Sequence, residues 1–77
     1  MAKLPRVNAP AMVRVLQKIG FVFDHQTGSH RVYYHPTRRR AVVPYHAGKT
    51  LSPKVLRDIL RSAGLSVEEF RRLLNDP

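Results

Sequence analysis

Apolar positions recur in two different rhythms along this 77-residue chain. Over residues 11–19, 53–63 and 67–74 they return every three or four positions, which is the period of an amphipathic helix. Between the first two of these segments, residues 21–26, 30–35 and 41–45 have the length and alternation of short strands, separated by turns rich in Gly, Pro and Thr. The pattern predicts the order helix, three strands, helix, helix.

Each predicted helix is bounded by residues that favour helix ends. Asparagine or serine precedes each one as an N-cap, and glycine follows the first two, where a positive φ ends the helix. The third also has the Ser-x-x-Glu spacing of a capping box. In chain order these residues are Asn8, Gly20, Ser52, Gly64, Ser66 and Glu69. We therefore expect three separate helices, of which the last serves the structure.

The connections between the predicted strands are short, so neighbouring strands should pair antiparallel. We expect an α+β fold in which helices pack on one face of a three-stranded antiparallel sheet. A chain of this length forms one domain, here residues 1–77 with a core of about residues 8–74. On the second strand, alternation separates His30, Val32 and Tyr34 from Arg31, Tyr33 and His35, but it does not say which set the helices cover.

Composition excludes several classes of protein. The chain has no cysteine, so it has neither a disulfide nor a thiolate metal site. No apolar run is long enough to span a membrane, and residues 1–6 lack the apolar region of a secretion signal. We expect a protein of the cytoplasm that makes no contact with membranes.

Charge points to a polyanionic partner. Fourteen Lys and Arg stand against five acidic residues, for a formal net charge of +9. Twelve of the basic and two of the acidic side chains lie in residues 1–61, so the positive field belongs to this part of the chain. A solubilising surface usually mixes the two signs, so binding to a polyanion is the preferred interpretation of this charge.

The most distinctive stretch is the turn at residues 27–30, Thr-Gly-Ser-His. Gly28 accepts a positive φ and Ser29 can hydrogen-bond the neighbouring backbone, so the turn can hold a fixed shape. It delivers His30 to the start of a strand, with one side anchored and the other in water. A histidine so placed can take or give a proton. His30 is the candidate catalytic residue, although a histidine in a turn is by itself more often structural.

Two basic segments could hold a phosphate backbone. Arg38, Arg39 and Arg40 follow one another in the second turn, where guanidinium groups can pair with phosphate oxygens and have no obvious structural use. Lys49 lies in the polar connection after the third strand and could reach the same polyanion. These four residues are predicted to bind nucleic acid.

The remaining histidines and the tyrosines have weaker interpretations. His25, His35 and His46 lack the spacing of a metal site, so no metal is expected. His46 could be a second proton-transfer group, but a role at a strand end is slightly favoured. Tyr33, Tyr34 and Tyr45 could stack on bases, yet tyrosines in strands more often pack across the sheet.

Taken in order, the motifs resemble the HicA family of bacterial toxins. The resemblance rests on five stretches over residues 8–74, namely Ile19-Gly20-Phe21, Gly28-Ser29-His30-Arg31-Val32-Tyr33, His35-Pro36, residues 43–49 (VPYHAGK) and residues 56–70 (LRDILRSAGLSVEEF). It implies a fold like the double-stranded RNA-binding domain and a type II toxin–antitoxin system. The family's members cleave mRNA without a metal or other cofactor, through one histidine on the second strand.

The resemblance assigns that catalytic role to His30, with Gly28 and Ser29 shaping its turn. It also adds Arg31 to Arg38, Arg39, Arg40 and Lys49 as groups that could neutralise charge on the reacting phosphate. It implies a HicB-type antitoxin, which should present acidic side chains and cover the groove near His30. Self-association of the chain is not required.

Two other functions fit the same charge. A module of this fold could bind RNA without cutting it, and a basic protein could associate with DNA or ribosomes. The second is disfavoured because three strands separate the two main helices, which leaves no helix-turn-helix pair.

Overall fold

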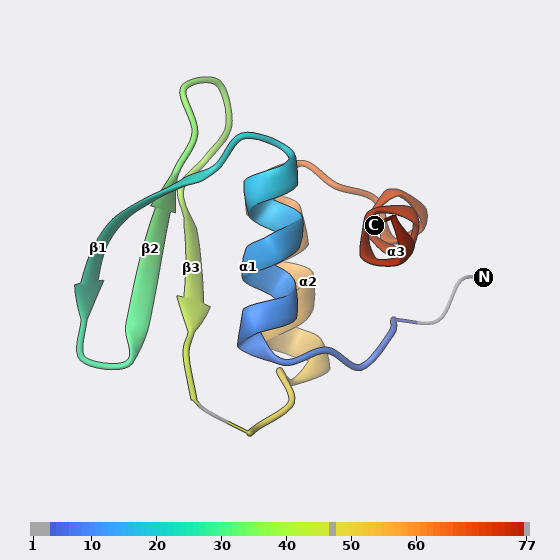
Figure 1. Cartoon of the computed structure of the whole chain (residues 1–77), viewed down its shortest axis with the longest axis horizontal. Coiled ribbons are helices and arrows are strands. Elements are labelled where there is room, and N and C mark those ends of the chain that lie inside the picture. The colour runs from blue at the N-terminus through green and yellow to red at the C-terminus, as the bar shows by residue number, and fades with distance from the viewer. Residues whose placement is uncertain (1–3, 47, 77) are drawn as a thin grey trace.

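The computed structural model describes residues 4–46 and 48–76. Within them the chain forms, in order, α1 (Ala9–Lys18), β1 (Val22–Thr27), β2 (His30–Tyr34), β3 (Ala41–Pro44), α2 (Pro53–Ala63) and α3 (Val67–Asn75) (Figure 1). The predicted order of one helix, three strands and two helices is confirmed.

The helix ends follow the predicted signals. The Asn8 side chain accepts a hydrogen bond from Ala11 N at 3.0 Å, and α1 begins two residues before the predicted start. Ser52 caps α2 in the same way, and Gly64 ends that helix with φ 72°. A capping box between Ser66 and Glu69 opens α3. Each cap satisfies a backbone group that the helix itself leaves unpaired.

The three strands form one antiparallel sheet in the order β1-β2-β3, so β2 is central. Thr27 pairs with His30 at the end of the β1–β2 hairpin, and His30 also lies opposite Pro44 of β3. The first residue of β2 therefore has neighbours on both sides. All six residues of β1 are exposed, because this edge strand reaches away from the helices (Figure 1).

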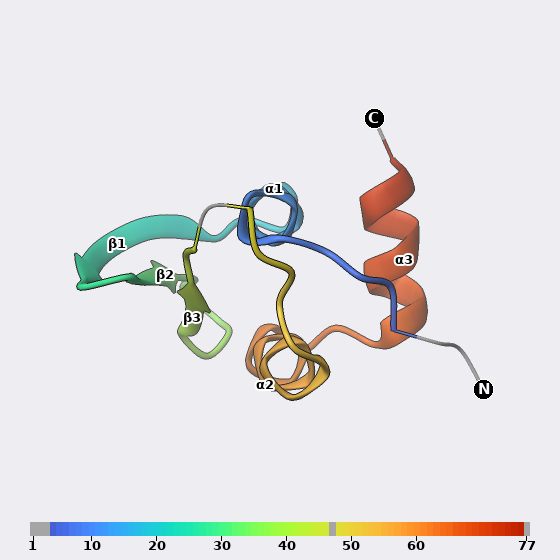
Figure 2. The same cartoon turned by 90° about the horizontal axis from the view of Figure 1, so that it is seen from below.

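The helices cover the face of the sheet that carries Tyr33, which is only 2% exposed. Ala41 and Val43 of β3 are fully buried on the same face. On the other face Tyr34 and Val42 stay 42% and 45% exposed, so this outer face is free of helices. Figure 2 shows α1 and α2 beside one another next to the sheet, with α3 beyond them. The structure therefore shows which face of β2 the helices cover. Tyr33 lies on the covered face, and His30, Val32 and Tyr34 lie on the outer face.

The core lies between the sheet and the helices. Met12 and Leu16 of α1 and Phe70 of α3 are completely buried, together with apolar residues of α2. Burying a side chain of this size contributes roughly 1.5–3 kcal/mol. The expectation that α3 closes the core is confirmed by Phe70.

Each predicted strand differs from the observed one at its ends. The prediction began β1 at Phe21, but this residue precedes the strand and is buried against the ring of His35 at a centroid distance of 5.0 Å. β2 ends at Tyr34 and β3 at Pro44, one residue earlier than predicted. His35 leaves the strand because its ring bonds the end of α1, as described below.

Candidate functional site

The hairpin turn before His30 has the geometry expected from its sequence. Gly28 has φ 59°, while no residue other than glycine has a positive φ in the described part of the chain. A glycine with positive φ at the first of two loop positions matches the twist of a tight hairpin. The turn therefore sets where His30 stands at the start of β2.

His30 lies on the outer face of the sheet and is exposed. Its row on β2 continues through Val32 and Tyr34, away from the helices. An imidazole here is reachable by a large polyanion as well as by water. Two acids lie near this face: Asp24 is paired with His25 and Arg40, and Asp58 lines a hollow at the β3 edge.

Ser29 links the turn to the end of β3. Its carbonyl oxygen accepts a hydrogen bond from Tyr45 N at 2.6 Å, and its hydroxyl lies 3.5 Å from His46 Nε2. Both contacts hold the turn against the end of β3. His46 is exposed and lies at the same end of the sheet as His30.

Arg31 lies on the opposite face from His30. Its guanidinium carbon stands 3.7 Å above the centroid of the Tyr45 ring, a stacking distance that favours a cation–π contact. The Arg31 Nε atom is buried without a hydrogen-bond partner among the described residues. The structure does not bring Arg31 together with His30.

The three successive arginines lie at the far end of the sheet from His30. Four residues of β2 separate the two ends, or roughly 13 Å at the rise of an extended strand. Arg38 Nη1 donates to Ala63 O at 2.6 Å, and Arg40 Nη1 donates to Asp24 Oδ2 at 3.2 Å. The expectation that these arginines lack a structural use is therefore wrong for Arg38 and Arg40. Arg39 is exposed.

Lys49 lies at the His30 end instead. It follows β3 in the connection to α2, next to Gly48 with φ 74°, and its backbone N donates to His46 O at 3.3 Å. Its side chain is exposed. Because the ring of His46 lies 3.5 Å from the hydroxyl of Ser29, which directly precedes His30, Lys49 is placed at the His30 end of the sheet.

A shallow hollow extends along the β3 edge, between the end of the sheet with the three arginines and the end with His30. It has a volume of about 220 Å³ and lies between β3 and α2. Its lining residues are Arg40, Val42, Pro44, Val55, Asp58, Ile59 and Ser62. Because Arg40 directly precedes β3 and Pro44 ends it opposite His30, the hollow runs from the arginine turn toward the His30 end of the sheet.

The histidines do not gather around a metal. No group of three His, Cys, Asp or Glu side chains suited to a metal ion occurs in residues 4–46 and 48–76. His35 is structural: Thr37 N donates to its Nδ1 at 3.1 Å, so Nε2 carries the proton that it donates to Ile19 O at 3.0 Å. This bond satisfies a carbonyl at the end of α1.

The sequence did not predict the group formed by Asp24, His25 and Arg40. Asp24 Oδ2 lies 2.9 Å from His25 Nδ1 and accepts the bond from Arg40 noted above. Arg40 also stands 5.7 Å from the centroid of the Tyr34 ring, so the group lies on the outer face with His30. A sequence search for acid–histidine neighbours would have found Asp24-His25, but not its position in the sheet.

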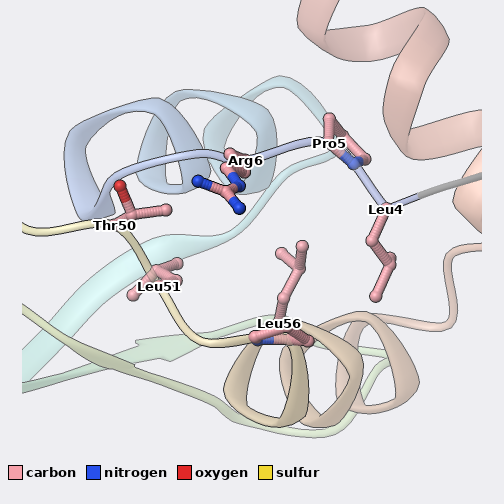
Figure 3. Close-up of a pocket in the computed structure, with 7 residues that line it drawn as sticks. Leu4, Pro5, Arg6, Thr50, Leu51 and Leu56 are labelled. Carbon is pink, nitrogen blue, oxygen red and sulfur yellow. The ribbon is translucent and has the colours of Figure 1, made fainter.

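A second pocket lies away from these residues, on the helical side of the molecule. It has a volume of about 310 Å³ between the segment that precedes α1 and the start of α2 (Figure 3). Its lining is largely apolar and consists of Leu4, Pro5, Arg6, Thr50, Leu51, Pro53 and Leu56. None of the predicted site residues contributes to it.

In the part of the chain described, no helix has the length and apolar character needed to cross a membrane.

The fold and the site define a small, basic α+β domain like the double-stranded RNA-binding domain, with an exposed histidine at a hairpin. Residues 10–65 match the family model described as HicA toxin of bacterial toxin–antitoxin. Because this match covers most of the chain, the protein belongs to the HicA family and is a toxin of a toxin–antitoxin system, a class that is paired with an antitoxin. A comparison with curated proteins found no match.

Proposed function

We propose that this toxin is an mRNA endoribonuclease that works without a metal and uses His30 for proton transfer. The observation that carries the proposal is the position of His30, exposed on the helix-free face at the start of β2 in a chain of net charge +9. A histidine there can approach the backbone of a bound RNA. Membership of the HicA family supports the same activity. Action on mRNA would take place in the cytoplasm.

The chemistry uses the RNA's own nucleophile. His30 takes the proton of a ribose 2′-OH, the 2′ oxygen forms a bond to the neighbouring phosphorus, and the bond from phosphorus to the 5′ oxygen breaks. The departing 5′ oxygen takes up a proton, and the products are a 2′,3′-cyclic phosphate and a 5′-hydroxyl end. Proton transfer by one positioned histidine contributes on the order of 10²- to 10⁴-fold in rate. One such group is enough for a slow nuclease, which suits a toxin that acts on many messages.

The basic side chains have graded roles in this proposal. Lys49 at the His30 end is the first candidate to hold the reacting phosphate, because a positive group near developing negative charge lowers the barrier. Arg39, which is exposed, would bind the strand at the far end of the sheet, and Arg40, which lines the β3 hollow and is paired with Asp24, would add to the positive field there. Arg38 and Arg31 use part of their guanidinium groups in the structure and contribute mainly to the positive field.

Gly28 and Ser29 would act by shaping the turn. The positive φ of Gly28 and the backbone contact of Ser29 with Tyr45 hold the start of β2 in place. Substitutions at these two positions should therefore change the rate through the position of His30, while the affinity for RNA changes little.

The proposal is tested by incubating the purified protein with RNA in excess chelator. Cleavage should persist in chelator, and a 2′-deoxy substitution at the cut site should abolish it. Loss of cleavage on chelation would contradict the metal-free mechanism. If the protein bound RNA and never cut it, the non-catalytic RNA-binding module would be the better description.

We also propose that the antitoxin is of the HicB type and blocks the face around His30 with acidic side chains. Opposite charge on the partner would speed association and select this face. Expression of the toxin alone should arrest growth, and the product of the adjacent gene should relieve the arrest. A neighbouring protein that binds the toxin and leaves His30 open to RNA would contradict this arrangement.

A further inference from the structure

The register of β1 changes within the strand. Phe23 pairs with Tyr33, but the next pair along the two strands is His25 with Val32, which leaves Asp24 as an extra residue. Such a bulge shifts the alternation of the residues that follow it. In a regular strand His25 would share the inner face with Phe23. Because of the bulge, it lies opposite Val32 on the outer face.

The bulge therefore puts two histidines on one face. Thr27 lies opposite His30, and His25 is two residues before Thr27, so His25 and His30 are diagonal neighbours across the hairpin. Diagonal neighbours in an antiparallel pair have Cα atoms roughly 7–8 Å apart. The attacking and departing oxygens of a phosphodiester lie on opposite sides of the phosphorus, so two imidazoles at this separation can each serve one of them.

The ring of His25 is held by its neighbours. Its Nδ1 lies 2.9 Å from Asp24 Oδ2 and donates to this carboxylate, which leaves Nε2 free. The carboxylate is fixed in turn by Arg40 at 3.2 Å. A carboxylate bonded to Nδ1 orients an imidazole and stabilises the positive charge that the ring carries when protonated. With the His25 side chain 52% exposed, Nε2 is open to a substrate on the outer face.

We propose that His25, oriented by Asp24 on the outer face of the sheet, is a second catalytic residue that protonates the departing 5′ oxygen. This step rests on the ribonuclease function proposed above. His30 receives the 2′-OH proton as the oxygen–phosphorus bond forms. As the bond from phosphorus to the 5′ oxygen breaks, Nε2 of His25 gives its proton to that oxygen. Water later returns a proton to His25, and His30 releases one.

The test compares two RNA oligonucleotides that differ at the cut site, one with the natural 5′ oxygen and one with sulfur in its place. A thiolate departs without being protonated, so only the natural substrate needs an acid. On the natural substrate, His25→Ala should lower kcat/KM by about 10²- to 10⁴-fold. On the sulfur substrate it should stay within about threefold of the unmodified protein. The His30→Ala variant should lose activity on both substrates.

A pH profile gives an independent readout. The charged and titratable groups that face His25 are Asp24, Arg40 through Asp24, and the two diagonal neighbours on β2, His30 and Tyr34. The unmodified protein should show a bell-shaped profile of kcat/KM, and His25→Ala should lose the decrease on the alkaline side, where a protonated acid is no longer available. The Asp24→Asn variant should retain this decrease while lowering the rate on the natural substrate.

Three results would overturn the assignment. Full activity of His25→Ala on the natural substrate would show that His25 transfers no proton. Equal losses on both substrates would mean that the residue acts in structure or binding, and circular dichroism together with a His25→Gln variant would identify a folding defect. If the unmodified protein cut neither substrate, the ribonuclease function itself would fail, and the role of His25 with it.

Discussion

Arg38 Nη1 donates a hydrogen bond of 2.6 Å to the carbonyl oxygen of Ala63. The bond joins the turn after β2 to the last residue of α2, across 25 positions of the chain. Helix C-termini leave carbonyl groups unpaired and carry partial negative charge, so an arginine there is favourable on both grounds. Within the arginine run, Arg38 is thus a structural residue as well as a source of charge.

Arg38 and Arg39 should therefore differ in how much each contributes to the free energy of unfolding. Arg38→Gln should lower the free energy of unfolding by about 1–2 kcal/mol, because a charged donor to a helix end is lost. Arg39→Gln should change it by less than about 0.5 kcal/mol. Urea denaturation of the two variants beside the unmodified protein makes the comparison. Equal effects at the two positions would contradict the structural role of Arg38.

The glycines that follow α1 and precede β2 should differ in their tolerance of alanine. Gly20 has φ 101°, and a Cβ there would lie 3.2 Å from His35 Nε2. Gly28 has φ 59°, and a Cβ there would meet no atom within 4 Å. Gly20→Ala should cost up to about 3 kcal/mol, and Gly28→Ala about 1 kcal/mol. Thermal unfolding of both variants tests this order, and its reversal would contradict the packing of His35 against the end of α1.

Lys18 should hold α3 in place. Its Nζ donates to Leu73 O at 2.6 Å and to Asp76 O, both near the end of α3. Lys18→Met should therefore raise the amide hydrogen-exchange rates of residues 67–75 more than those of α1 or α2. Arg14→Met removes a basic side chain from the same helix and is the matched control. A uniform change over the whole chain in both variants would argue against a local role for Lys18.

Glu69 should make stability depend on pH. The Ser66 backbone N–H donates to Glu69 Oε1 at 3.0 Å, and this bond lowers the pKa of the carboxyl group. The stabilisation is complete above the ordinary glutamate pKa of about 4.3 and is lost as pH falls through the lower pKa of the folded state. The difference in melting temperature between the unmodified protein and Glu69→Gln should be constant above that range and change below it. A difference independent of pH would contradict the capping box.

Local signals in the sequence were enough to predict the fold. The caps at Asn8, Ser52 and Ser66 mark where the helices begin, since each acts within a few residues, while the predicted strand ends differ from the observed ones by one residue. Alternation on β2 correctly separated His30 from Tyr33. Alternation did not predict which face of the sheet the helices cover. The burial of Ala41 and Val43 beside Tyr33 shows it, because burial depends on the whole fold.

The parts of the site that escaped prediction depend on contacts between distant residues. The bulge at Asp24 lies in a polar stretch, residues 24–27, where no apolar side chain marks the register. The bonds of Arg38 to Ala63 and of Lys18 to Leu73 join elements 25 and 55 positions apart. Long basic side chains in loops and on helices give no sequence signal of such partners, so the sequence alone leaves Arg38 free to bind phosphate.

The proposed ribonuclease activity depends most directly on His30, so the decisive measurement is the cleavage rate of a defined RNA by His30→Ala, with RNA affinity measured on the same preparation. The side chain is exposed and has no structural bond in the described residues, so the variant should fold. We predict a loss of about 100-fold or more in rate with an unchanged affinity. Cleavage at the original rate by a folded His30→Ala protein would contradict the central claim.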